Sequence, residues 1–161
     1  MVKKTDFAVF LNRFLTDYLP NKRGDSPQTI DSYRYSFIFL IDYYEEIYRI
    51  GPDRLSFADI TYGKISGYFD WLQETKLSSV STRNQRQAAI NSFIRFLMYE
   101  RPEYLNEYQR ILAIPVKKAP QKEISYLKTD GVSALMGTVD TSKANGLRDY
   151  VILMLLYSTG I

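Results

Sequence analysis

The residue types best suited to chemistry lie together between Leu77 and Leu97, in the run LSSVSTRNQRQAAINSFIRFL. The run opens with hydroxyl side chains, which suit phosphate oxygens, and continues with Arg, Asn and Gln, which can read base edges. It ends in apolar residues at helical spacing, so it predicts a helix with one buried stripe and one polar face. The candidate contact residues on this helix are Thr82, Arg83, Asn84, Arg86, Gln87, Asn91 and Arg95.

The spacing of these side chains suggests a shared surface. Arg83, Arg86 and Gln87 are three and four positions apart, which predicts a common helical face, and Asn91 and Arg95 would extend it. One interpretation is a helix that enters a DNA groove by its N-terminal half. The alternative is the ordinary solvated face of an amphipathic helix, and the residues alone leave both open.

Two further groups could contact a polyanion. The first is in the segment AIPVKKAPQKE, which has two prolines and no helical periodicity and so predicts an extended linker. Its Lys117, Lys118 and Lys122 could follow phosphates without reading sequence, or could serve solubility alone. The second surrounds the start of the helix after Ser26, where a positive helix terminus could take a phosphate; its members are Lys22, Arg23, Gln28, Thr29 and Arg34.

Composition narrows the class of protein. The chain has 161 residues, 45% of them hydrophobic, so it can form a core. It has neither Cys nor His, which excludes disulfides, thiolate metal sites and histidine bases, and we expect no metal or cofactor. We recognise no signal peptide, and the longest apolar run, Tyr150–Tyr157, is far shorter than the roughly 20 residues of a membrane span. A cytoplasmic location is the simplest expectation.

Charge is distributed unevenly although the net charge is only +3. Residues 76–118 hold eight basic and three acidic side chains, whereas residues 41–75 hold three basic and seven acidic ones. Such asymmetry fits a protein that presents one face to a polyanion. The acidic stretch is expected to face away from it.

Apolar periodicity predicts helices throughout and no strand pair. Thr5, Ser26, Thr61 and either Ser79 or Ser81 are the expected N-caps of the first four helices, and Gly67 is either a weak point or a close helix crossing. The expected helices are Asp6–Tyr18, one from Pro27 to before Gly51-Pro52, one after Thr61, one reaching about Glu100, a short one after Pro102, one capped by Thr129 and reaching about Met136, and Gly146–Ser158. The N-terminal part is therefore predicted to be an all-α bundle.

Several segments, taken in order, resemble the tyrosine recombinases of the phage-integrase type. SPQTIDSY (Ser26–Tyr33) is similar to the start of that family's second helix, Asp59-Ile60-Thr61 to the entry of its third, and Ser81–Leu97 to its fourth. ISYLKTDGVSALM and GLRDYVILMLLYSTGI resemble the opening of its catalytic domain.

The resemblance implies a fold and a domain plan. It implies a four- to five-helix orthogonal bundle, the SAM-like core-binding domain, followed by a truncated start of the catalytic domain. The implied boundaries are 1–112 for the DNA-binding domain, 113–124 for a basic linker and 125–161 for the catalytic part. The implied role is that of an arm clamping duplex DNA at a recombination site, within a parent enzyme that forms a covalent phosphotyrosine and acts as a tetramer on paired sites.

The resemblance also implies that this chain has no catalytic residue. In the family the first catalytic Arg lies two positions after a Thr-Gly dipeptide, and here Thr159-Gly160 are followed only by Ile161. The remaining active-site groups lie further downstream, so we expect a fragment that cannot cleave DNA. The alternative, supported by the modest net charge and the many aromatic residues, is a helical protein-interaction module without a nucleic-acid role.

Overall fold

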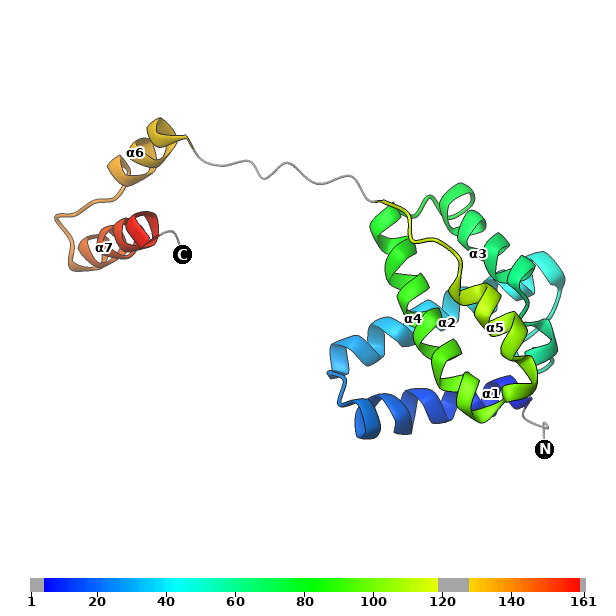
Figure 1. Ribbon diagram of the computed structural model, residues 1–161. Coiled ribbons are helices and arrows are strands. Elements are labelled where there is room, and N and C mark those ends of the chain that lie inside the picture. Colours follow the sequence, from blue (N-terminus) through cyan, green and yellow to red (C-terminus); the bar gives the residue numbers. More distant parts are fainter. Residues whose placement is uncertain (1–4, 119–127, 160–161) are drawn as a thin grey trace. The chain divides into compact units, whose positions relative to one another are not determined.

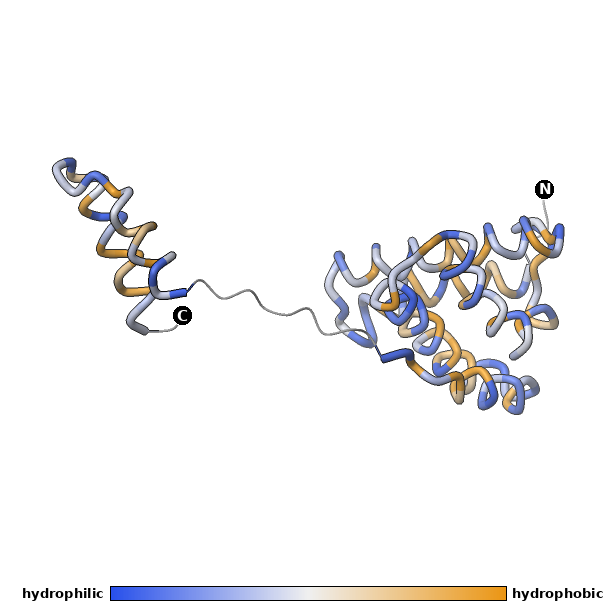
Figure 2. The backbone as a smooth tube through the Cα atoms, turned by 90° about the horizontal axis from the view of Figure 1, so that it is seen from above, coloured by the Kyte–Doolittle hydropathy of each residue, from blue (hydrophilic) through white to orange (hydrophobic). Residues whose placement is uncertain are grey.

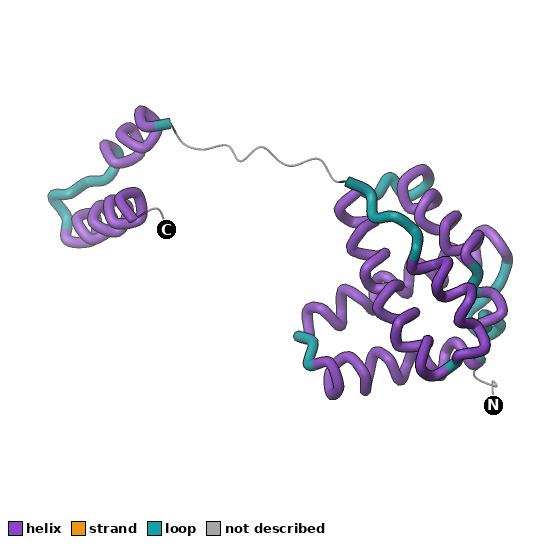
Figure 3. Tube along the Cα trace, in the orientation of Figure 1, coloured by secondary structure: helices purple, strands orange, loops and turns teal. Residues whose placement is uncertain are grey.

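The computed structural model describes residues 5–118 and 128–159, which form only helices and loops (Figure 3). The all-α expectation is confirmed. The chain divides into two compact units, Met1–Ala119 and Pro120–Ile161, and each is treated by itself (Figure 1). Lys122 and the segment ISYL lie outside the described residues.

The first unit begins with α1 (Asp6–Arg13), capped by the Thr5 hydroxyl, which accepts a hydrogen bond from the Ala8 amide at 3.2 Å. The chain continues as a π-helical stretch, η1 (Phe14–Arg23), instead of ending near Tyr18 as expected. Pro20 lies inside it, because a locally wider winding tolerates a residue that cannot donate a backbone hydrogen bond. Gly24, at φ 72°, ends the stretch in the left-handed conformation that favours glycine.

The next two helices are capped as the sequence predicted. Helix α2 (Pro27–Tyr48) has Ser26 as N-cap and Pro27 at its first position, and it ends shortly before Gly51-Pro52. A short 3-10 turn, η2 (Phe57–Asp59), leads into α3 (Tyr62–Glu74), whose N-cap is Thr61.

Helix α4 (Val80–Glu100) carries most of the candidate residues, and its N-cap is Ser79. The turn η3 (Pro102–Tyr104) then leads into α5 (Leu105–Leu112). The side chains that fill the centre of the unit come from every one of these helices, with Phe14, Phe37 and Phe93 in mutual aromatic contact. Centroid separations of 5.1–6.1 Å suit tilted and edge-on ring packing. The Phe93 ring of α4 therefore packs against both η1 and α2.

Gly67 marks a close helix crossing, which was one of the two expected roles. A Cβ at this position would lie 2.7 Å from the hydroxyl oxygen of Tyr43 on α2, a contact that real side chains do not make. Tyr43 is buried and packs on Trp71 and Tyr68, so its ring cannot easily move away. Glycine here allows α3 and α2 to approach.

The segment after α5, Ala113–Lys118, packs on the bundle and is called the strap below. Ile114 is buried, and its carbonyl oxygen accepts a 2.7 Å hydrogen bond from Gln87 Nε2. The first compact unit therefore continues past the expected boundary at residue 112, and the expected extended linker begins as an attached segment.

The second unit contains α6 (Thr129–Gly137) and α7 (Ala144–Thr159). Lys128, not Thr129, holds the N-cap position of α6. Hydrophobic residues recur along both helices (Figure 2), and several on α7, such as Leu147, Met154 and Leu155, are about half exposed. Among the helices that the structure describes, none has the length and apolarity needed to cross a bilayer.

Candidate nucleic-acid interface

The predicted common face of Arg83, Arg86 and Gln87 is wrong. Arg83 is 3% exposed and Gln87 is fully buried, so neither side chain can reach a nucleic acid. Arg83 Nη1 donates to Gln87 Oε1 at 2.7 Å, and its guanidinium lies 4.7 Å from the centre of the Phe69 ring. The two residues continue the core stripe of Ile90 and Ile94 toward the helix start, and spacings of four, three and four place all of them on one side.

Arg83 is a buried cation held by amide oxygens. Burial lowers its pKa, and the charge of Asp70 opposes that shift. Its Nε is buried without a hydrogen-bond partner among the described residues. A guanidinium stays protonated in such surroundings, so Arg83 contributes a positive charge but no contact.

Two of the predicted residues lie on the flank of α4 that faces α2. Thr82 and Arg86 line a small hollow of about 160 Å³ together with Ser32, Tyr35, Ser36 and Gln85. The Arg86 guanidinium stacks 3.9 Å from the centre of the Phe39 ring and donates to Ser78 Oγ at 3.2 Å. The Arg86 guanidinium is therefore already in contact with a ring on α2 and with a serine just before α4.

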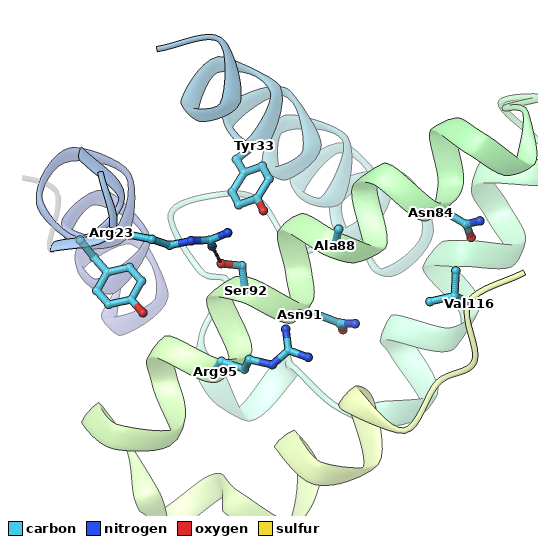
Figure 4. A pocket seen from close by; sticks show the side chains of 9 residues that line it. Arg23, Tyr33, Asn84, Ala88, Asn91, Ser92, Arg95 and Val116 are labelled. Atoms are coloured by element: carbon cyan, nitrogen blue, oxygen red, sulfur yellow. Dashed lines mark hydrogen bonds between the residues drawn. The ribbon is translucent and has the colours of Figure 1, made fainter. Parts of the chain in front are cut away.

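Several polar residues of α4 line a hollow on the first unit (Figure 4). Asn84, Ala88, Asn91 and Arg95 follow one another at spacings of four, three and four, and this set is called the α4 stripe. The hollow has a volume of about 520 Å³ and is completed by Tyr18, Arg23, Tyr33, Ser92 and Val116. It is a concave surface of mixed polar and apolar character between η1, α2, α4 and the strap.

Arg23 forms the wall opposite Arg95. It donates a hydrogen bond from Nη1 to the Ser92 hydroxyl on α4, and its guanidinium lies 6.0 Å from the centre of the Tyr33 ring (Figure 4). Its Nε lies 3.4 Å from Asp25 Oδ2. The sequence placed Arg23 near the start of α2 but gave no spacing that linked it to α4. Arg23 was one of the candidates around the start of α2, whereas Tyr33 was not among the predicted contact residues.

The two asparagine side chains of the α4 stripe differ in their hydrogen bonds. Asn84 is tied to the strap, since Nδ2 donates to the Lys117 carbonyl at 2.6 Å and Oδ1 accepts from the Lys117 amide at 3.2 Å. Asn91 Oδ1 is buried and has no hydrogen-bond partner among residues 5–118 and 128–159. An unpaired buried acceptor is costly, and the Asn91 side chain otherwise lines the hollow.

The predicted residues of α2 are less suited to contact. Thr29 takes part in the helix cap, with its amide donating to Ser26 Oγ at 3.3 Å. Arg34 is paired with Asp31 at 2.7 Å, which compensates its charge. Lys117 Nζ donates to Gln73 Oε1 at 2.5 Å, and Lys118 is exposed.

Positive charge without a carboxylate partner gathers on α4 and the strap. Within the described ranges, ion pairs bind basic side chains of η1, α2, α3 and α5, but none involves Arg86, Arg95 or Lys117. Arg49 and Arg54 also lack one, but they lie in the acidic region after α2. Of the two basic side chains that line the hollow, Arg95 has no carboxylate partner among the described residues and Arg23 lies near Asp25.

A groove elsewhere on the first unit has a different character. A second groove of about 220 Å³ between α1 and α2 is lined by apolar residues and Asn12, with no basic side chain. Over the described ranges, no group of three or more acidic, His or Cys side chains is placed to hold a metal ion.

Three deeply buried tyrosines of the bundle are poor nucleophiles. Burial raises the pKa of Tyr44, Tyr68 and Tyr108, which opposes formation of a phenolate. The Tyr44 hydroxyl donates to the Asp59 carbonyl at 2.9 Å, and the Tyr68 hydroxyl donates to the Ser36 carbonyl at 3.3 Å. Both hydroxyl groups are therefore used in hydrogen bonds inside the bundle.

Comparison with known proteins agrees with the bundle and with the segments that resembled recombinases. Residues 11–101 match the family model of the phage integrase N-terminal SAM-like domain. The chain belongs to this family.

Curated relatives carry corresponding names. The chain is 36% identical to an integrase/recombinase of Sinorhizobium fredii, y4rC, over 100% of this chain and 48% of that protein. It is 29% identical to the tyrosine recombinase XerC of Myxococcus xanthus, over 98% of this chain and 49% of that protein. It is 26% identical to the tyrosine recombinase XerD of Listeria innocua, over 94% and 49% respectively. The chain thus spans about half the length of these relatives, and no solved structure matches it significantly.

Proposed function

We propose that the first unit binds duplex DNA in the hollow bounded by the α4 stripe, Arg23 and the strap. The observation that carries the proposal is the position of Arg95, which has no carboxylate partner among the described residues, on the same concave surface as Arg23 and next to the strap. Phosphate oxygens would be contacted by Arg95, Arg23 and the strap lysines. Such contacts supply affinity and register and are independent of sequence.

The middle of the stripe suits close approach to a groove. Ala88 is exposed and small, so the helix backbone can come near the base pairs without a long side chain in between. Asn91 beside it has an amide that can pair with a base edge, and an alanine methyl can contact the thymine methyl group. Arg83 lies beneath and adds positive charge to the field without touching the ligand.

At the level of the whole protein, we propose that this bundle is the DNA-binding arm of a site-specific tyrosine recombinase. The support is the family membership and the relatives named as recombinases. The parent would cut and rejoin DNA through a phosphotyrosine and would act with further copies of itself on paired sites. Cleavage chemistry would come from residues outside this sequence, as the buried tyrosines here suit packing instead.

Binding to a labelled duplex at increasing salt tests the DNA role. Fluorescence anisotropy should show an affinity that falls steeply between about 50 and 200 mM salt, because each phosphate contact releases counterions. A flat response, or no binding at low salt, would reject the proposal. That outcome would favour the protein-interaction alternative.

A further inference from the structure

The polar side chains at the start of α4 are joined to the strap in one network. Gln87 Nε2 donates to the Ile114 carbonyl at 2.7 Å, and Asn84 pairs with both the amide and the carbonyl of Lys117. Arg83 Nη1 donates to Gln87 Oε1 at 2.7 Å and to Asn84 Oδ1 at 3.1 Å. The hydrogen bonds to Ile114 and Lys117 join positions that are 27 and 33 residues apart in the chain.

The network has a consequence for where the chain leaves the bundle. The strap contains Pro115 and no helix, and beyond Ile114 its side chains are exposed. Its attachment past that point therefore depends on the Asn84 amide, reinforced by Lys117 Nζ on Gln73. Without these bonds, the strap would be an open segment with many conformations.

We propose that Arg83, Asn84 and Gln87 form a latch that fixes the strap on α4 and so holds Lys117 and Lys118 beside the hollow. The proposal rests on the DNA role proposed above and explains three of the predicted contact residues as positioning residues. Arg83 orients the two amides by donating to both of their oxygens. A strap ordered before binding lowers the entropic cost of placing its lysines on phosphates.

Hydrogen exchange of the Lys117 amide tests the latch without DNA. Asn84→Ala removes the acceptor of this amide, and exchange should accelerate roughly 2- to 10-fold, which corresponds to one net hydrogen bond. Gln85→Ala is the matched control, since Gln85 is an exposed amide on the same helix that bonds Ser32 on α2 instead. Unchanged exchange in Asn84→Ala would overturn the latch.

DNA affinity of Gln87 variants tests the positioning role, because Gln87 is buried and cannot contact the ligand itself. Gln87→Glu keeps an acceptor for Arg83 but has no donor for the Ile114 carbonyl, whereas Gln87→Met loses both functions. Both variants should bind duplex several-fold more weakly while thermal unfolding shows a folded protein. Exchange of strap amides should be faster in both.

The outcomes separate the two proposals. Faster strap exchange together with unchanged duplex affinity would overturn the positioning role. If the unaltered chain fails to bind duplex, the proposed function fails, but the exchange result still decides whether the latch exists. Should Gln87→Met not fold, Asn84→Ala and Gln87→Glu give the same decision.

Discussion

The guanidinium of Arg83 donates a 2.7 Å hydrogen bond to the amide oxygen of Gln87, and both side chains lie inside the bundle. The side of α4 that carries this pair faces the core, whereas Ala88, Asn91 and Arg95 line the hollow. DNA contact is consequently expected from the side that lines the hollow. The distinction leads to different predictions for two arginines on the same helix.

Arg95→Ala should weaken duplex binding and leave stability nearly unchanged, because Arg95 is exposed and its described surroundings hold no ion-pair partner. Loss of a phosphate contact should lower the slope of log affinity against log salt by about 1, and loss of a base contact should cost ~1–3 kcal/mol. Anisotropy titrations measure both. Arg110→Ala on α5, which removes an arginine paired with Glu107 and outside the hollow, is the control. Equal losses in the two variants would contradict the assignment.

Arg83→Lys should act in the opposite way. Lysine keeps the charge but cannot bond both amide oxygens with a planar fork or stack on Phe69 in the same manner. We expect a loss of about 1–3 kcal/mol in the free energy of unfolding, since buried acceptors lose their donor. The salt slope of duplex binding by the folded variant should not change. Denaturant unfolding and anisotropy check the two parts, and a reduced slope with intact stability would restore Arg83 as a contact residue.

Gly67→Ala should destabilise the bundle by about 1–3 kcal/mol, although alanine is the better helix former by ~1 kcal/mol. The added Cβ would meet the buried Tyr43 hydroxyl at 2.7 Å. Gly63→Ala in the same helix is the matched comparison, because a Cβ there meets nothing within 4 Å. Thermal unfolding of both should give opposite signs. A stabilised Gly67→Ala variant would show that the helix crossing adjusts freely.

Stability should fall as pH drops through the range in which carboxylates titrate. Burial raises the pKa of Asp59, but hydrogen bonds from Lys64 and from the Ser56 hydroxyl and amide outweigh it and lower the pKa overall. Because the pKa of Asp59 is lower in the folded state, its ionised carboxylate stabilises the fold at pH values above its pKa in the unfolded chain, about 3.9. This stabilisation is lost as the pH falls through the pKa of the folded state. Asp59→Asn should flatten the acid limb in unfolding experiments.

Near neutral pH the same measurement should be flat. The chain has no His, so no side chain has an ordinary pKa between about pH 6 and 8. A marked change in stability in that interval would require a strongly shifted group that the described residues do not reveal.

Sequence patterns predicted the fold better than the site. Caps at Thr5, Ser26, Thr61 and Ser79 are local signals, and their amides and hydroxyls act within one turn. The exception was η1, where the helix expected to end at Tyr18 continued as a π-helical stretch to Arg23. Family membership then followed from segments that lie in a fixed order along the chain.

The site was harder, because burial of a polar residue depends on its partners. Arg83 and Gln87 have residue types typical of DNA contact, yet the four-three-four spacing toward Ile90 and Ile94 indicated the core side. The buried role of Gln87 depends on a tertiary contact, because the strap packs on the start of α4 and its Ile114 carbonyl accepts the Gln87 hydrogen bond. Arg23 reaches the hollow through Ser92, 69 residues away, and no local pattern reports such a pair.

Backbone amide shifts of the isotope-labelled chain, followed by NMR during titration with a short duplex, show which surface contacts DNA. We expect the largest changes on the α4 stripe, on Arg23 and on Lys117, and we expect them to shrink as salt rises. Changes centred on the apolar groove between α1 and α2, or spread over the acidic end of α2, would contradict this expectation.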